Sequence, residues 1–201
     1  MSTKKSLTKE LPGTERRFSA SGDFIERLEG RERREAIPRD DIIPRLGLSR
    51  IDIVVDLGSG IGYFTFAMAE TASEIVAIDI EPKMLEVLSS RIETNRTANV
   101  SPVRGEMTDL PLADSSADFV LAAFVFHEVS DHSGLLMECA RVLKASGHLV
   151  VIDFQKHDTP IGPPVSERKT PEHVLKKAKP WFRLDSRYET DVFYLLRLAK
   201  T

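Results

Sequence analysis

Three glycines at alternate positions, Gly58, Gly60 and Gly62, follow a short run of β-branched residues that contains Asp56 near its end. The run is typical of a buried strand, and glycine permits a tight turn with a ligand close to the main chain because it has no Cβ. After the glycines the apolar spacing changes to that of one helix face, and N–H groups at a helix start can hold a carboxylate or phosphate. The stretch therefore predicts the strand, turn and helix that open a nucleotide-type α/β fold.

The spacing of these glycines indicates the kind of nucleotide ligand. A dinucleotide loop has the pattern G-x-G-x-x-G, whereas this chain has G-x-G-x-G with Asp56 just before it. A carboxylate beside a backbone cradle suits an amino-acid group, which carries an ammonium as well as a carboxylate, better than it suits a pyrophosphate. The next predicted strand ends in Asp79, whose carboxylate could accept both hydroxyls of a ribose. Together these residues predict a nucleoside with an amino-acid tail.

At these residues the chain resembles the class I S-adenosylmethionine-dependent methyltransferases, and most closely the type-11 group that includes the ubiquinone and menaquinone biosynthesis methyltransferases. The resemblance covers residues 25–199, and its blocks occur in the family's order. The residues that carry it are 55–62 (VDLGSGIG), 77–80 (AIDI), 105–112 (GEMTDLPL), 117–120 (ADFV) through 127–129 (HEV), 141–144 (RVLK) and 147–154 (GHLVVIDF).

The resemblance implies S-adenosylmethionine as cofactor, with S-adenosylhomocysteine as product, and it implies roles for particular residues. Asp56 and the backbone of 58–62 would hold the methionine part, Asp79 the ribose, and Glu106 and Met107 the adenine. Three alternatives stay open: Asp56 could cap the glycine turn, Met84 could belong to the core, and Glu106 could be an exposed loop residue. The residues expected at the cofactor are Asp56, Gly58, Ser59, Gly60, Gly62, Tyr63, Asp79, Ile80 (as a wall to the ring), Met84, Glu106, Met107 and Phe124.

His127 is the candidate catalytic residue. It follows the fourth predicted strand, and in the resembling family the segment at this position faces the transferred methyl group. A histidine titrates near neutral pH and can act as a general base. The alternative is that His127 packs near the cofactor and bonds locally. The segment His127-Glu128-Val129-Ser130-Asp131-His132 is not the zinc motif H-E-x-x-H, because its second histidine comes one residue late. We therefore expect no metal.

The methyl acceptor is expected to be a small molecule. The chain lacks the Asn/Asp-Pro-Pro-aromatic block of enzymes that methylate exocyclic base amines, and its single cysteine, Cys139, disfavours an arsenite-type site. Phe124, Phe126 and a lid over 155–170 suit an apolar acceptor, with Tyr63 and Phe64 as further candidates for its pocket. An RNA or protein methyltransferase, a nicotinamide-dependent oxidoreductase and a non-catalytic cofactor-binding module remain alternatives.

Alternating strands and helices predict an α/β fold, a Rossmann-like, doubly wound, mainly parallel seven-stranded sheet with an antiparallel C-terminal strand pair. Its ligand is expected at the carboxyl ends of the strands, near the switch in strand order. The expected strands are 51–57, 74–79, 99–104, 117–123, 148–154 (after a turn at 145–147), 181–188 and 191–199, and the expected helices are 23–36, 40–46, 81–96, 133–143 and 171–179.

Length and composition limit the remaining possibilities. The chain has 201 residues with a net charge of -3, so we expect one domain over 21–201 and no nucleic-acid partner. Residues 1–20 are expected to be a mobile basic tail. The resemblance implies that helices within 23–47 form a cap over the cofactor, and packing on a sheet edge remains the alternative. No apolar run suggests a signal peptide or membrane span, which favours a cytoplasmic protein. The sequence carries no signal for an oligomeric state.

Overall fold

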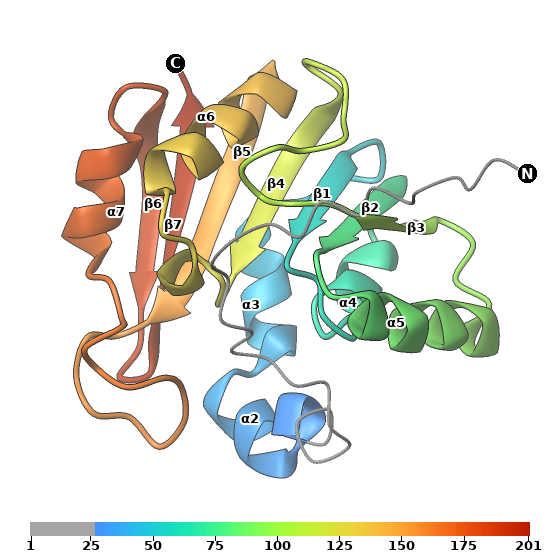
Figure 1. The fold of residues 1–201 in the computed structure, drawn as a ribbon, viewed down its shortest axis with the longest axis horizontal. Helices are drawn as coiled ribbons and strands as arrows, with labels where there is room; N and C mark the ends of the chain where they lie inside the picture. Colours follow the sequence, from blue (N-terminus) through green and yellow to red (C-terminus); the bar gives the residue numbers. More distant parts are fainter. Residues whose placement is uncertain (1–26) are drawn as a thin grey trace, which may run out of the picture.

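The computed structural model describes residues 27–201, so the tail expected over 1–20 and the start of the helix expected from residue 23 lie outside the described residues. The described residues form one seven-stranded sheet (Figure 1). The strands are β1 (Ile53–Leu57), β2 (Glu74–Asp79), β3 (Val100–Arg104), β4 (Ala117–Ala123), β5 (Leu143–Phe154), β6 (Phe182–Glu189) and β7 (Phe193–Lys200).

The strand order is β3-β2-β1-β4-β5-β7-β6. Strands β1 to β5 pair in parallel, whereas β7 runs antiparallel to both β5 and β6. The chain passes from β1 outward to β2 and β3, and then returns to β4 on the other side of β1. The predicted fold is therefore confirmed, and its switch in strand order lies between β1 and β4, where ligands of open α/β sheets bind.

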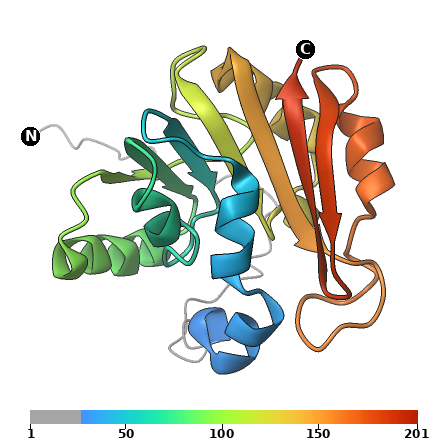
Figure 2. The ribbon, with the colours of Figure 1, turned by 180° about the vertical axis from the view of Figure 1, so that it is seen from behind.

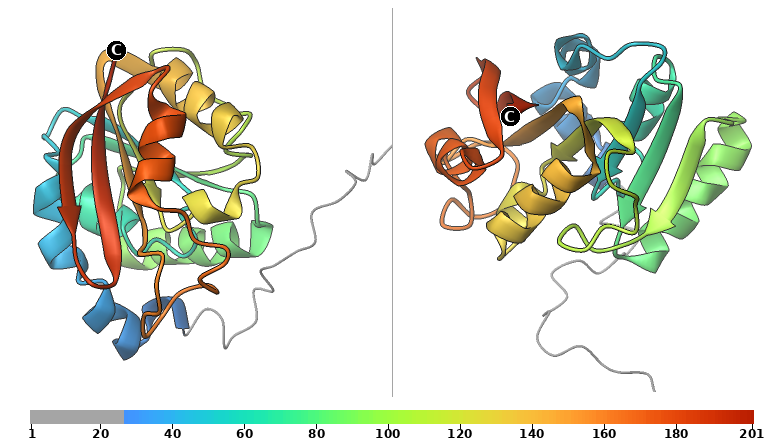
Figure 3. Two further views of the ribbon diagram at one scale, coloured as in Figure 1. Left: turned by 90° about the vertical axis from the view of Figure 1, so that its left-hand side faces the viewer. Right: turned by 90° about the horizontal axis from the view of Figure 1, so that it is seen from above.

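Helices cover both faces of the sheet. Their bounds are α2 (Arg31–Ala36), α3 (Arg39–Leu46), α4 (Thr65–Ala69), α5 (Pro82–Asn95), α6 (His132–Val142) and α7 (Pro171–Ala178), and a 3-10 turn, η1 (Phe126–Glu128), follows β4. Helices α3, α4 and α5 pack on one face, and α6 and α7 on the other (Figures 2 and 3). Strand β4 shows why its sequence is apolar throughout: Val120 and Leu121 are both fully buried, on opposite faces. Within residues 27–201, no helix is long and apolar enough to cross a membrane.

The structure corrects two of the expected boundaries. The helix expected over 23–36 is interrupted at Gly30, whose extended ψ of 157° separates the helical residues 27–29 from α2. The turn expected at 145–147 lies inside β5, because Leu143 already pairs with Ala117 and a shift in register takes up the extra residues. Neither correction moves the carboxyl ends of the strands.

Candidate functional site

The three glycines after β1 all have positive φ angles, +64°, +53° and +93° for Gly58, Gly60 and Gly62, but they are needed for different reasons. A Cβ on Gly58 would lie 2.4 Å from Val125 Cγ1, and one on Gly62 would lie 2.6 Å from the ring of Phe66. Both glycines therefore permit close packing. Gly60 differs, because a Cβ there would have no heavy atom within 4 Å. Of the three, Gly60 is the one whose missing side chain leaves room for a ligand.

The amides of this loop donate hydrogen bonds within the protein. Ser59 N donates to Ile78 O at 3.0 Å, Gly62 N to Ser59 O at 3.0 Å, and Gly60 N to Asp79 Oδ2 at 2.8 Å. Two of these bonds join the loop to the carboxyl end of β2. The loop is therefore fixed in place by β2, and these three amides already have acceptors.

Asp79 lies where the sequence predicts the ribose ligand. Its Oδ1 accepts from Glu81 N at 2.9 Å, and its Oδ2 accepts from the amide of Gly60. Burial raises the pKa of Asp79, and the backbone hydrogen bonds act against this shift. A carboxylate has about four acceptor positions, so Asp79 can still accept from two hydroxyls of a bound diol.

Asp56 is 3% exposed and accepts a hydrogen bond of 2.6 Å from Thr65 Oγ1 at the start of α4. Burial raises the pKa of Asp56 to about 7, although the bond from Thr65 acts to lower it. A cationic group placed beside Asp56 would favour its ionised form. Asp56 thus fixes the start of α4 and also lines a pocket at the end of β1, so its bond within the protein is compatible with a ligand contact.

This pocket, which we call the loop pocket, lies between the glycine loop and the N-terminal helical residues. Two buried polar atoms in its wall, Arg33 Nε and Ser59 Oγ, have no hydrogen-bond partner among residues 27–201. The Arg33 guanidinium lies over two rings, 5.4 Å from the Tyr63 centroid and 5.5 Å from that of Phe124. Arg33 was not predicted, because a sequence offers no signal that distinguishes it from its charged neighbours. The lining residues are Leu28, Arg33, Asp56, Gly58, Ser59, Gly60, Ile61, Tyr63, Phe64 and Ala123.

The lining of the loop pocket does not include four other residues expected at the cofactor, namely Ile80, Met84, Glu106 and Met107. Ile80 is 49% exposed, as an uncovered apolar wall would be. Gly105 N donates to Asp79 O at 3.2 Å and so brings the segment of Glu106 and Met107 beside β2, although Glu106 itself is exposed. Met84 is buried and does not line the loop pocket.

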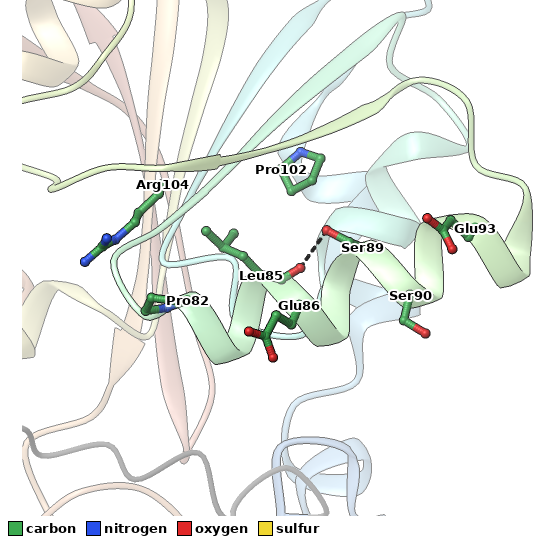
Figure 4. Close-up of a pocket in the computed structure, with 8 residues that line it drawn as sticks. All are labelled: Pro82, Leu85, Glu86, Ser89, Ser90, Glu93, Pro102 and Arg104. Carbon is green, nitrogen blue, oxygen red and sulfur yellow. Dashed lines mark hydrogen bonds between the residues drawn. The ribbon is translucent and has the colours of Figure 1, made fainter.

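A larger hollow lies elsewhere, between α5 and the edge strand β3 (Figure 4). Its wall contains Arg104 and two glutamates of α5, Glu86 and Glu93, and none of the residues predicted for the site. Ser89 in this wall bonds to the carbonyl of Leu85 on its own helix. The hollow therefore lies at the sheet edge and shares no lining residue with the loop pocket.

Phe124, directly after β4, has a φ of +59°, which is strained for a residue with a side chain. Its ring contacts Phe154 at a centroid distance of 4.7 Å and stacks on Phe64 at 6.2 Å. This backbone conformation places the ring of Phe124 beside the loop pocket, next to Arg33. This wall suits an apolar or aromatic molecule.

His127 forms a pair with Asp153 at the carboxyl end of β5. Its Nδ1 lies 2.7 Å from Asp153 Oδ1, and its backbone N–H donates to Asp153 Oδ2 at 3.0 Å. Burial alone would lower the pKa of His127, but the hydrogen bond and charge of the fully buried Asp153 outweigh it, so the pKa is raised. Asp153 was also missed, although an aspartate within the apolar run Val150-Val151-Ile152-Asp153-Phe154 was a possible signal. Within residues 27–201, no group of three or more metal-ligating side chains is placed to hold a metal ion.

Comparison with known proteins identifies the family. A family model described as a methyltransferase domain, Methyltransf_11, matches residues 55–151. The demethylmenaquinone methyltransferase of Tropheryma whipplei is 33% identical over 155 residues, which cover 77% of this chain and 54% of that protein. Residues 55–151 of the chain are a type-11 methyltransferase domain.

Two further comparisons extend this result, one to another relative and one to the fold. The uncharacterized methyltransferase YcgJ of Bacillus subtilis is 31% identical over 108 residues, covering 54% of this chain and 43% of YcgJ. A crystal structure of a SAM-dependent methyltransferase from Aquifex aeolicus superposes with a TM-score of 0.83 at 24% identity, covering 89% of this chain and 98% of that one. That structure confirms the fold. This type-11 chain spans about half the length of the curated relatives it matches.

Proposed function

We propose that this chain transfers a methyl group from S-adenosylmethionine to a small-molecule acceptor. The observation that carries the proposal is the setting of Gly60: it has open space where its side chain would be, and the carboxylates of Asp56 and Asp79 lie at the ends of the two strands beside it. One carboxylate is suited to an ammonium and the other to a diol, and the cofactor carries both groups.

The residues present fit this cofactor. Asp56 would hold the ammonium, and its raised pKa would fall when a cation binds beside it. Asp79 would accept the ribose hydroxyls, with Ile80 as a wall to the adenine and Glu106 and Met107 beside its edge. When bound, the cofactor supplies a sulfonium methyl group that is already electrophilic. The chain's own task is to orient the acceptor and to exclude water.

His127 is proposed as the base that takes a proton from the acceptor. Asp153 holds Nδ1 of the ring, which leaves Nε2 for the acceptor, as in other His–Asp pairs. Nε2 lies 3.7 Å from Glu128 Oε1. The competing role, in which the His–Asp pair only fixes the turn η1, predicts that the pH dependence of turnover is the same without Asp153.

The acceptor is proposed to be apolar and small enough to lie against Phe124 and Phe154. The name of the Tropheryma relative, a demethylmenaquinone methyltransferase, supports a small molecule of the quinone class. The segment 155–170, expected as a lid, is pinned by the buried Arg168, whose Nη1 donates to Gln155 O, His157 O and Thr159 Oγ1 at 3.0, 2.7 and 2.8 Å. We propose that this segment is a fixed wall of the acceptor site, and that residues 21–201 are one domain whose N-terminal helices cap the cofactor.

The proposal is tested by titrating the purified chain with S-adenosylmethionine, S-adenosylhomocysteine and NAD in a thermal-shift assay. A ligand at a hundred times its dissociation constant stabilises the fold by about 2.7 kcal/mol. Stabilisation by the two sulfur nucleosides, followed by methyl transfer to a member of a quinone and phenol panel, is the expected result. Stabilisation by NAD alone would refute the proposal. Binding without turnover on any acceptor would favour the non-catalytic module instead.

A further inference from the structure

The loop pocket contains two buried hydrogen-bond donors without acceptors. Arg33 Nε and Ser59 Oγ reach it from different parts of the chain, α2 and the glycine loop. A buried polar group without a hydrogen-bond partner destabilises the folded state. Two in one pocket point to a ligand that accepts hydrogen bonds there.

The ligand group is anionic, because one of the two donors is a guanidinium. The Arg33 guanidinium lies over the rings of Tyr63 and Phe124, which satisfy its charge in part but leave Nε without an acceptor. Burial lowers the pKa of Arg33. A carboxylate would both neutralise the charge and accept from the planar fork, as guanidinium groups favour.

The glycine loop offers little to compete with Arg33 for such an anion. The amides of Ser59, Gly60 and Gly62, which the glycine pattern predicts as a cradle, donate to Ile78, Asp79 and Ser59. The acceptor of Gly60 N, moreover, is Asp79 itself, the residue proposed for the ribose. Asp56, which a bound ammonium would hold in its ionised form, also disfavours a second anion on its own side of the pocket.

We infer that Arg33, assisted by Ser59, receives the carboxylate of the cofactor's amino-acid tail, while Asp56 receives its ammonium. This inference rests on the proposed function. It makes the N-terminal helix α2 part of the cofactor site and not only a cover. It also makes the presence of the carboxylate a specificity requirement of this chain.

The inference has a consequence for α2, which contains no buried residue. The fully buried Ile37 anchors the end of the helix, and polar contacts hold its flanks: Tyr63 Oη donates to Ile37 O at 2.7 Å, and Arg91 Nη2 donates to Glu29 Oε2 at 2.8 Å. A carboxylate bonded to both Arg33 and Ser59 would add a link between α2 and the glycine loop. Cofactor binding should therefore slow amide hydrogen exchange in residues 30–37.

The test compares two ligands that differ by one group, S-adenosylmethionine and decarboxylated S-adenosylmethionine, on wild-type protein and on Arg33→Met, by isothermal titration calorimetry. A hydrogen-bonded charge pair is worth about ten- to hundredfold in affinity. Wild type should therefore prefer the carboxylated ligand by about that factor, and Arg33→Met should lose the preference by binding S-adenosylmethionine more weakly. Arg34→Met, on the exposed side of the same helix, is the matched control and should keep the wild-type preference.

The outcomes separate this inference from the proposed function. If Arg33→Met keeps the wild-type preference, or weakens both ligands equally, Arg33 has only a structural role in α2 and the inference is wrong. Arg33→Lys, which keeps the charge, should retain part of the preference. If wild type binds neither ligand while remaining folded in a thermal melt, the proposed function fails, and the inference fails with it.

Discussion

Gly60→Ala should leave the chain folded but strongly weaken its affinity for S-adenosylmethionine. The new Cβ would have no heavy atom within 4 Å, so it adds no clash, but the φ of +53° must be adopted by a residue with a side chain. A left-handed conformation costs about 1–2 kcal/mol for such residues. In a domain of this size, a loss of 1–2 kcal/mol lowers Tm by about 2–8 °C. The Cβ would occupy the space proposed for the cofactor, and a loss of affinity of at least about tenfold, or 1.4 kcal/mol, is expected.

Gly47→Ala is the matched control for the strain. Gly47 ends α3 with a φ of +71°, and its added Cβ would meet a flexible side chain, Arg197 Nη1 at 3.3 Å, away from the loop pocket. Gly62→Ala is the control for packing, because its Cβ would lie 2.8 Å from Leu88 Cδ1 as well as against Phe66. We expect a similar Tm loss in Gly47→Ala with wild-type affinity, and a larger Tm loss in Gly62→Ala.

The assay is calorimetric titration of each folded variant with S-adenosylhomocysteine, alongside a thermal melt without ligand. The reasoning is refuted if Gly60→Ala binds within about twofold of wild type. It is equally refuted if Gly47→Ala loses as much affinity as Gly60→Ala, since the effect would then come from backbone strain and not from occupied space.

Three further substitutions test the charged residues of the site. Asp79→Asn should weaken cofactor binding about tenfold in the same titration, because an amide cannot accept from two hydroxyls while it serves two backbone amides; unchanged affinity would exclude the ribose role. Burial raises the Asp56 pKa to about 7, so the folded chain keeps a proton that the unfolded chain releases above about pH 4. Asp56 therefore makes the free energy of unfolding fall as the pH rises from about 4 to about 7. Asp56→Asn should therefore raise Tm at pH 8, but not at pH 4, while it weakens cofactor binding; a lower Tm at pH 8 would contradict this. Asp153→Asn should lower the pKa of His127 and move the acid limb of the kcat profile to lower pH, with a reduced kcat; an unchanged profile would leave His127 only a packing role.

The fold was predictable because its signals are local. The runs at 74–79 and 117–123 were placed at their observed ends, since both are apolar segments bounded by polar residues or turns. Gly47 marked the end of α3 in the sequence, because glycine readily adopts the left-handed conformation that it has there. The predicted boundaries were wrong where strand pairing decides them. Strand β5 starts early because Leu143 pairs with Ala117, which lies 26 residues earlier in the chain.

The site was predictable only in part, and for a related reason. The glycine loop, Asp56 and Asp79 lie at strand ends, where the strand pattern itself points to them. Arg33 and Asp153 are recognised as site residues only through tertiary contacts. Arg33 lies over the rings of Tyr63 and Phe124, and Asp153 bonds to His127, which is 26 residues away in sequence. No periodicity records such contacts. The break that Asp153 makes in an apolar run was the one signal in the sequence, and it does not show which residue Asp153 contacts.

The central claim is that the bend between β1 and α4 binds the sulfonium nucleoside. The most direct measurement is a crystal structure of the chain grown with S-adenosylhomocysteine. We predict electron density for the nucleoside beside Gly60, with its ribose hydroxyls on Asp79 and its amino-acid tail between Asp56 and Arg33. Density in the hollow between α5 and β3, or at any position that leaves Gly60 and Asp79 without contact, would contradict the account.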